Sequence, residues 1–208
     1  MPPDDTFERN AGAPVCGIDE AGRGPWAGPV VAAAVILDPG RTPPGLDDSK
    51  RLSAPRREAL FRELQDCARI GVGQASVAEI DALNILQASF LAMRRALADL
   101  PDRPAAVLVD GAQAPSGLGL PTTALIKGDA RSVSIAAASI VAKVTRDALM
   151  VALARQFPGY GWETNMGYGV RAHATALDRL GITPHHRRSF RPIHHILCEG
   201  RERTSEML

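Results

Sequence analysis

The sequence has few cysteines and few aromatic residues, and it lacks a long apolar run. Its three cysteines, Cys16, Cys67 and Cys198, are odd in number and scattered, which argues against a disulfide framework and favours reduced thiols. The longest apolar run, VVAAAVIL, is too short to span a bilayer, and the opening MPPDDTFERN is too polar for a signal peptide. These absences predict a cytoplasmic protein that does not contact a membrane.

The chain length bounds the number of domains. A chain of 208 residues is long enough for one domain with a substantial core. No repeat or linker divides it. We therefore expect a single domain over residues 14–199, which includes C-terminal helices from about residue 170, and flexible tails at residues 1–13 and 200–208.

The net charge of +1 conceals an uneven distribution of charged residues. Residues 1–50 contain 4 basic and 8 acidic side chains, whereas residues 141–208 contain 10 basic and 6 acidic ones. All five histidines also lie in the second of these segments. This asymmetry suggests a cation site near the front of the chain and an anion such as a phosphate chain nearby, with a chance distribution as the alternative.

Apolar periodicity and turn signals predict that strands and helices alternate along the chain. Strands are expected at residues 15–18, 30–37, 69–76, 105–109 and 122–127. Helices are expected from Ser53, at residues 79–100, 134–157 and 171–180, and after Pro184. The glycine-rich turn between the first two strands predicts that they are antiparallel neighbours. The order indicates the α/β class, with a mixed five-stranded sheet flanked by helices and a small helical C-terminal part.

Four acidic residues share one context at the ends of predicted strands. Asp19 and Glu20 end the first strand, Asp110 ends the fourth, and Asp129 follows the fifth. The reactive crevice of an open α/β sheet lies beyond the carboxyl ends of its parallel strands, so Asp19 and Asp110 would meet if their strands are neighbours. Carboxylates without Cys or His are ligands for Mg²⁺ or Mn²⁺. Four of them suffice for two metal ions that support displacement at phosphorus.

Simpler readings of these acids remain open. Asp110 precedes Gly111, and Asp-Gly is a common turn pair. Asp19 and Glu20 are adjacent, and adjacent side chains on a strand point to opposite faces. Both could ligate one ion only if the strand bends, or if Glu20 contributes its backbone carbonyl.

The turn GRGPWAG at residues 22–28 is neither a P-loop nor a dinucleotide-binding signature, because the required glycine and lysine spacing is absent. It offers exposed backbone groups and one guanidinium, from Arg23. Such a turn suits close contact with a sugar-phosphate backbone. The alternative is a tight hairpin with an incidental arginine.

DEAGRGP at residues 19–25 resembles the signature of the type 2 ribonucleases H, in particular bacterial ribonuclease HII. Further segments resemble this family in order along the chain: DDSKRLS at 47–53, LNIL at 83–86, VDG at 109–111, KGD at 127–129, AASIVAKVTRD at 137–147, GYG at 167–169 and HRRSF at 186–190. The resemblance covers the chain from about Val15 to Ile193. It implies a ribonuclease H-like fold.

The resemblance implies hydrolysis of the RNA strand of RNA/DNA hybrids and cleavage 5′ of ribonucleotides embedded in duplex DNA. The products would carry 5′-phosphate and 3′-hydroxyl ends, and the role would be ribonucleotide removal in DNA replication and repair. By position, Asp19, Glu20 and Asp110 would bind metal, and Asp129 would complete the set at a second Mn²⁺ or Mg²⁺ ion.

The resemblance also implies substrate-binding residues. Gly22, Arg23, Gly24 and Tyr168 would read the ribose 2′-hydroxyl and the RNA–DNA junction, which agrees with the role of the 2′-hydroxyl in distinguishing RNA from DNA. For Tyr168 the alternative is packing against the C-terminal helices. One departure is Met166, which stands where the family often has a lysine, so that a phosphate contact is lost there.

Further polar residues are candidates for phosphate contact. They are Lys50, Ser139, Lys143 and Arg187. Lys143 and Asp147 are four residues apart on a predicted helix, and we favour an ion pair between them over a catalytic role for Asp147. A zinc site at His194, His195 and Cys198 is not favoured, because a second ligand pair with suitable spacing is missing.

Two other classes of function compete with a hybrid-specific nuclease. One is a nuclease or integrase-type transferase of the same fold that acts on DNA. The other is a non-catalytic nucleic-acid-binding module, which clustered carboxylates disfavour because they repel phosphate. We expect a monomer that acts on nucleic acid without an obligate protein partner.

Overall fold

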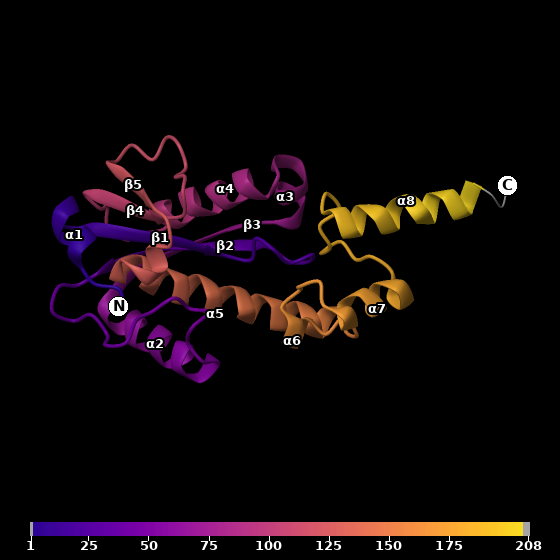
Figure 1. The fold of residues 1–208 in the computed structure, drawn as a ribbon, viewed down its shortest axis with the longest axis horizontal. Coiled ribbons are helices and arrows are strands. Elements are labelled where there is room, and N and C mark those ends of the chain that lie inside the picture. Colours follow the sequence, from indigo (N-terminus) through magenta and orange to yellow (C-terminus); the bar gives the residue numbers. More distant parts are fainter. Residues whose placement is uncertain (1, 206–208) are drawn as a thin grey trace.

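The computed structural model describes residues 2–205, with side chains as far as Cys198. A five-stranded mixed sheet, with the strand order β3-β2-β1-β4-β5, forms its centre (Figure 1). The strands are β1 (Val15–Ala21), β2 (Val30–Leu37), β3 (Ala68–Ala75), β4 (Ala106–Asp110) and β5 (Thr122–Leu125). β1 pairs antiparallel with β2 and parallel with β4, which confirms the expected fold class and the expected neighbours.

Helices cover both faces of the sheet. Along the chain the helices after β2 are α2 (Ala54–Cys67), α3 (Val77–Leu83), α4 (Ile85–Ala98) and α5 (Val133–Gln156), and then α6 (Trp162–Asn165), α7 (Arg171–Leu180) and α8 (Arg191–Ser205) in the C-terminal part. Figure 1 shows α4 on one face of the sheet, and α2 and α5 on the other. None of the helices between residues 2 and 205 is both long and apolar enough to cross a membrane.

Small residues in the strands allow the helices to pack closely. All residues of β2 from Val30 to Ile36 are buried, as expected of a strand covered on both faces. A Cβ at Gly17 of β1 would collide with the Ser134 backbone at the start of α5. The glycine therefore lets α5 approach the end of β1 that leads to Asp19.

Two predicted elements differ from the structure. The single helix expected at residues 79–100 is divided into α3 and α4 by Asn84, whose φ is 70°. Its side-chain oxygen accepts hydrogen bonds from the backbone N–H groups of Leu86 and Gln87, so Asn84 both ends one helix and caps the next. The fifth strand ends at Leu125, because Lys127 adopts a left-handed conformation with φ 55° and starts the 3₁₀ helix η1 (Gly128–Ala130).

The N-terminal segment is structured where a loose tail was expected. Residues Thr6–Ala11 form α1, and Glu8 Oε1 accepts hydrogen bonds from Ser132 Oγ at 2.5 Å and from Ser134 N at 2.9 Å. These groups lie at the start of α5, where unpaired N–H groups favour an acidic partner. At the other end, residues 200–205 continue α8, and residues 206–208 of the expected tail lie outside the described part.

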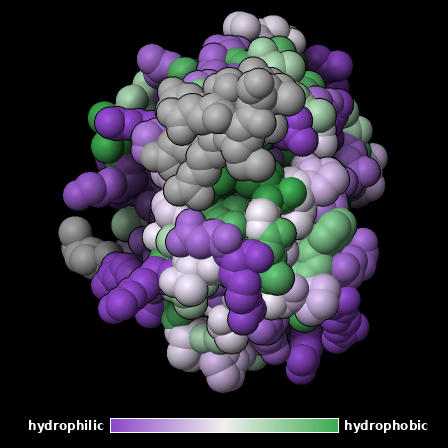
Figure 2. Space-filling model, turned by 90° about the vertical axis from the view of Figure 1, so that its right-hand side faces the viewer, coloured by the Kyte–Doolittle hydropathy of each residue, from purple (hydrophilic) through white to green (hydrophobic). Residues whose placement is uncertain are grey.

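The C-terminal part has its own apolar cluster. Met150 from α5, Trp162 from α6, Leu177 from α7 and Ile193 from α8 are buried in it, together with Ala27 from the turn after β1. The turn is therefore packed against the C-terminal helices. Figure 2 views this end of the molecule and shows polar side chains around its rim, with apolar side chains gathered near the centre.

Candidate active site

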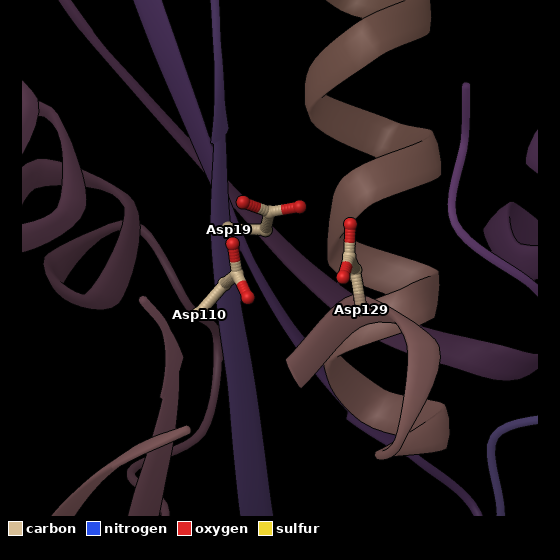
Figure 3. A group of neighbouring side chains, drawn as sticks. All are labelled: Asp19, Asp110 and Asp129. Atoms are coloured by element: carbon tan, nitrogen blue, oxygen red, sulfur yellow. The ribbon is translucent and has the colours of Figure 1, made fainter. Parts of the chain in front are cut away.

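Three acidic side chains meet at the carboxyl end of the central strands. Asp19 belongs to β1, Asp110 is the last residue of β4, and Asp129 lies in η1 after β5. One oxygen from each carboxylate lies within 4.8 Å of the other two, and Figure 3 shows the groups pointing toward one another. The parallel pairing of β1 with β4 brings Asp19 and Asp110 together. The N–H of Gly128 donates to Asp110 Oδ1 at 2.7 Å, which ties the turn carrying Asp129 to the end of β4.

The acid cluster disfavours its own ionised form. Asp19 and Asp129 are only 5% and 7% exposed. Burial raises the pKa of Asp19 well above its usual range, and the charges of Glu20 and Asp110 raise it further. Burial, followed by the charges of Asp110 and Asp48, raises the pKa of Asp129 to about 6. A bound cation would relieve this repulsion and favour the carboxylates.

Glu20 lies beside the acid cluster and not within its 4.8 Å group. Its Oε1 accepts a hydrogen bond from Arg23 Nη1 at 3.1 Å, whereas its buried Oε2 has no partner among the described residues. The opposite orientation of adjacent strand residues explains why Asp19 joins the cluster and Glu20 does not. A buried carboxylate oxygen without a donor is available to a cation, and the all-oxygen donor set fits Mg²⁺ or Mn²⁺.

Lys50 lies close enough to the acid cluster to interact with it electrostatically. Burial opposes its charged form, but Asp48 and the three clustered acids raise its pKa above the ordinary value. Ser139 of α5 holds the loop that contains Ser49 and Lys50. Its hydroxyl donates to Ser49 Oγ at 2.8 Å and accepts from Ser49 N at 3.3 Å. Ser139 is 4% exposed and its hydroxyl is hydrogen-bonded to Ser49, so in this conformation it supports the loop that carries Lys50, and its enclosure argues against the expected phosphate contact.

The glycine-rich turn and Tyr168 form one exposed surface. A Cβ at Gly24 would lie 3.5 Å from Tyr168 Cε1, and Tyr168 is 43% exposed. Arg23 is also exposed and reaches Glu20, while Gly22 is buried below. Tyr168 therefore does not fill the C-terminal core, which was the alternative to a substrate contact.

A buried histidine pair holds the loop that carries Tyr168. His173 Nδ1 lies 2.9 Å from the Tyr168 carbonyl oxygen, so it must carry the proton and donate. Its Nε2 then accepts from Trp162 Nε1 and from His186 Nε2, both at 3.1 Å. His186 Nδ1 in turn accepts from the N–H of Thr183 at 3.0 Å. Burial lowers the pKa of both histidines, that of His186 to about 4, which keeps this arrangement neutral.

Two of the candidate phosphate contacts have other partners. Arg187 is completely buried, and its guanidinium donates to backbone carbonyls, including those of Gly22 and Arg23. The expected contact between Arg187 and phosphate is therefore wrong for this conformation, because the side chain is enclosed. Lys143 Nζ lies 2.8 Å from Asp147 Oδ1, which confirms the expected ion pair along the helix.

Two residues near the site were not singled out from the sequence. Arg146 is 1% exposed and lies under the glycine-rich turn. The charge of Asp48 raises the pKa of both Lys50 and Asp129. Arg146 follows Ser139 and Ala142 on the buried face of α5, so an arginine on an apolar helix face was the available signal. Asp48 had a weaker signal in the acidic pair of DDSK.

The sheet order, with an acid cluster at the carboxyl edge, is that of the ribonuclease H fold, as solved ribonuclease H structures show below. The model of one protein family, ribonuclease HII, matches residues 16–193. The chain belongs to the ribonuclease HII family, as the motif resemblance predicted. It is therefore a ribonuclease H enzyme, an endoribonuclease of a family that acts on nucleic acid and depends on divalent metal ions.

Curated relatives agree over nearly the whole chain. Ribonuclease HII from Jannaschia sp. (strain CCS1) is 61% identical over 95% of this chain and 100% of its own length. Ribonuclease HII from Parvibaculum lavamentivorans is 57% identical over 99% of this chain and 78% of its own length.

Solved structures agree in fold. Ribonuclease H2 from Pyrococcus horikoshii OT3 has a TM-score of 0.74 and 29% identity, over 90% of this chain and 98% of its own. Ribonuclease HII of Archaeoglobus fulgidus, in a complex with PCNA, has a TM-score of 0.72 and 30% identity, over 83% of this chain and 93% of its own.

Proposed function

We propose that this enzyme hydrolyses the RNA strand of RNA/DNA hybrids and cuts on the 5′ side of ribonucleotides embedded in duplex DNA, leaving 5′-phosphate and 3′-hydroxyl ends. Its role would be the removal of ribonucleotides during DNA replication and repair. The observation that carries the proposal is the adjacency of the acid cluster to an exposed glycine-rich turn and Tyr168. A reaction centre and a surface suited to ribose thus lie together.

The acidic residues have distinct tasks in this proposal. Asp19 and Asp110 would hold the first ion, and Asp129 would bind at the second. Glu20 would contribute its unpartnered Oε2 or its backbone carbonyl. Two divalent ions, Mn²⁺ or Mg²⁺, would supply Lewis-acid stabilisation of charge in an in-line displacement at phosphorus if these residues hold them. The hydrogen bond from Gly128 to Asp110 keeps the acidic groups close before any ion binds, so little reorganisation is needed.

The substrate contacts would come from the neighbouring surface. Gly24 has no side chain to obstruct the nucleic acid, so the backbone of residues 22–24 can approach the ribose 2′-hydroxyl. The exposed ring of Tyr168 would stack against the sugar of the nucleotide after the ribonucleotide. Lys50 would neutralise phosphate next to the acid cluster. If Lys143 contacts phosphate, it must do so while paired with Asp147.

We further infer that residues 14–199 act as one catalytic domain in a cytoplasmic monomer without an obligate protein partner. The PCNA complex is that of the Archaeoglobus fulgidus relative. Light scattering after size-exclusion chromatography tests the monomer, because a dimer would double the measured mass.

One assay tests the proposed activity. The protein is incubated with Mn²⁺ or Mg²⁺ and a labelled DNA duplex that contains one ribonucleotide, beside an all-RNA/DNA hybrid and an all-DNA duplex. We expect cleavage 5′ of the ribonucleotide and along the RNA strand, with 3′-hydroxyl ends that a polymerase can extend. The all-DNA duplex should stay intact.

The same assay separates the competing functions. Cleavage of the all-DNA duplex at a similar rate would favour a DNA-acting nuclease or transferase of this fold. Binding without cleavage, with either metal, would favour a non-catalytic module. The buried carboxylates weigh against simple binding, since they would repel phosphate in the absence of ions.

A further inference from the structure

Two arginines are buried beneath the glycine-rich turn. Arg146 of α5 is 1% exposed, and Arg187, which precedes α8, is 0% exposed. Within the described residues, neither guanidinium forms an ion pair with a carboxylate. A buried charge without compensation is strongly unfavourable, so other groups must satisfy these donors.

Arg187 is satisfied by backbone carbonyls of the turn. Its Nε donates to the Gly28 carbonyl at 2.9 Å, and its Nη1 donates to the Arg23 carbonyl at 2.9 Å. Its Nη2 donates to the carbonyls of Gly22 at 2.6 Å and Pro29 at 3.2 Å. One side chain thus holds both ends of the turn that follows β1.

Arg146 connects the same turn to the segment before Tyr168. Its Nε donates to the Pro29 carbonyl at 3.0 Å and its Nη2 to the Ala27 carbonyl at 3.2 Å. Its Nη1 donates to the Met166 carbonyl at 3.0 Å. Met166 therefore contributes its backbone carbonyl to this network.

The inward direction of these carbonyls decides which groups face outward. In a trans peptide the C=O and the following N–H point in opposite directions. Because the carbonyls of Gly22 and Arg23 point to Arg187, the N–H groups of Arg23 and Gly24 point away from it, on the exposed side of the turn. The buried arginines therefore set the orientation of the backbone donors that a ribonucleotide would meet.

The packing leaves little freedom for another arrangement. Gly22 has a φ of 98°, and a Cβ there would collide with Arg146 Nε. Burial, followed by the neighbouring charge of Arg146, lowers the pKa of Arg187 to about 9. The chain thus keeps two like charges together beneath this turn, where apolar residues would pack without that cost.

We propose that Arg146 and Arg187 are positioning residues that hold residues 22–29 and 166–169 in one arrangement and so present the turn's N–H groups and the Tyr168 ring to the ribonucleotide. This inference rests on the proposed function. Arginine suits the task because its planar fork donates to several carbonyls at fixed angles, whereas a lysine is a single compact charge.

The test compares Arg187→Lys and Arg187→Met, and the same pair at position 146, with the parent enzyme. We expect both replacements at each position to reduce kcat/KM about ten- to a hundred-fold, because small misplacements of positioning groups have effects of that size. The loss should lie mainly in KM, and it should be larger on a single embedded ribonucleotide than on a long RNA strand.

Two controls separate positioning from general stability. Arg179→Met removes an exposed arginine of α7 and should leave kcat/KM unchanged. Leu64→Ala destabilises the buried face of α2, and it should lower the melting temperature without changing the ratio of kcat/KM between the two substrates.

Hydrogen exchange measured by mass spectrometry gives a readout independent of activity. In the Arg187 and Arg146 variants we expect faster exchange at residues 22–29 and 166–169, with no change in β4. Wild-type activity of Arg187→Lys on both substrates would overturn the proposal. The proposal would also be overturned if Leu64→Ala showed the same substrate-dependent loss of kcat/KM as the arginine variants. If the parent enzyme failed to cut ribonucleotide-containing duplexes, the proposed function would fail, while unchanged exchange in the variants would separately refute the arginine pair.

Discussion

The acid cluster and the buried arginine pair are both concentrations of like charge, but they are completed differently. Arg146 and Arg187 have no acidic partner among the described residues, yet seven hydrogen bonds to backbone carbonyls satisfy them. Asp19 and Asp110 each accept one backbone N–H, and the unpartnered oxygen of Glu20 lies beside them. The arginines are complete without a ligand, whereas the acids are not.

This difference indicates which of the two charged clusters is open to a ligand of opposite charge. Backbone carbonyls compensate a buried guanidinium because each lone pair accepts a hydrogen bond at a distance the fold can supply. Buried carboxylates that repel one another need positive charge. Among the described residues Arg23 pairs with Glu20, and Lys50 acts on the acids without forming an ion pair with them. We therefore propose that the cluster satisfied by the backbone shapes the surface and that the unsatisfied cluster is the ion site.

The largest expected effect comes from removing a charge in the acid cluster. Asp19→Asn and Asp110→Asn should each reduce kcat by at least about a hundred- to a thousand-fold, since each loses a group that stabilises the reaction electrostatically. Without metal, the melting temperature should hold or rise, because repulsion decreases. Cleavage assays at saturating Mn²⁺ and thermal melts check both. Near-normal turnover in either variant would contradict the assignment of the ion site.

A smaller effect is expected at Tyr168. Stacking on an aromatic ring contributes about 1–3 kcal/mol, so Tyr168→Ala should lose roughly ten- to a hundred-fold in kcat/KM. Tyr168→Phe is the matched control, since it keeps the ring and removes only the hydroxyl. The loss should be larger on a single embedded ribonucleotide than on a long RNA strand. Equal losses on both would mean that Tyr168 contributes general affinity and does not read the junction.

The exposed side of the glycine-rich turn should show a milder and graded effect. Arg23→Ala should weaken binding a few-fold, because it removes one half-exposed positive charge from the surface that would meet the phosphate backbone. Gly24→Val should weaken it more, on the order of ten-fold, because its side chain would meet Tyr168 and keep the substrate from the backbone. Competition binding with labelled hybrids compares the two. If Gly24→Val bound hybrids like the parent, close backbone approach at this turn would be excluded.

The acid cluster should also determine how the metal-free protein responds to pH. The pKa of Asp129 is raised to about 6, so the folded state binds more protons than the unfolded state between about pH 4 and 6. Its contribution to the free energy of unfolding should therefore fall as pH rises through that window, by roughly 1–3 kcal/mol, since a pKa difference of one corresponds to about 1.4 kcal/mol.

Denaturant titrations of the metal-free protein and of Asp129→Asn measure this difference. The variant should lack the decline, and added Mg²⁺ should reverse it in the parent. Identical pH profiles for the two proteins would show that the pKa of Asp129 is not raised in the folded state.

The smallest effect is expected where opposite charges already compensate each other. Lys143 and Asp147 form an ion pair along α5, with side chains 23% and 22% exposed. Asp147→Ala should change the free energy of unfolding by less than about 0.5 kcal/mol, as is usual for pairs four residues apart. Chemical denaturation measures this, and a large loss of catalysis in the variant would instead give Asp147 a role in the reaction.

Local patterns were sufficient for most of the fold. Alternating apolar runs and turn signals placed the strands and the long helix α5 within a few residues, because the sheet and its covering helices follow simple periodicities. The break at Asn84 and helix α1 were missed. Asn84 sits inside an otherwise regular helical pattern, and α1 is held by Glu8 against the start of α5, a contact between segments distant in sequence.

For the candidate site, too, some features could be predicted from the sequence and others could not. The sequence predicted that Asp19, Glu20 and Asp110 lie near the carboxyl ends of strands. Strand polarity alone then decides which edge of the sheet such residues occupy. The separation of Glu20 from the cluster follows from strand alternation. By contrast, the burial of Arg187 could not be predicted from the sequence, because Arg187 stands in a polar segment where no apolar periodicity indicates which side chains are enclosed.

The sequence by itself determined the acid set, the glycine-rich turn and the family, since these depend on residue types and short spacings. Only the tertiary structure decided that Arg187, more than 150 residues beyond Gly22, lies beneath it. Satisfying a buried guanidinium requires carbonyls from several segments to converge, and convergence is a property of the packed chain. The same packing assigns one arginine of the family motif, Arg23, to the exposed surface and another, Arg187, to the interior.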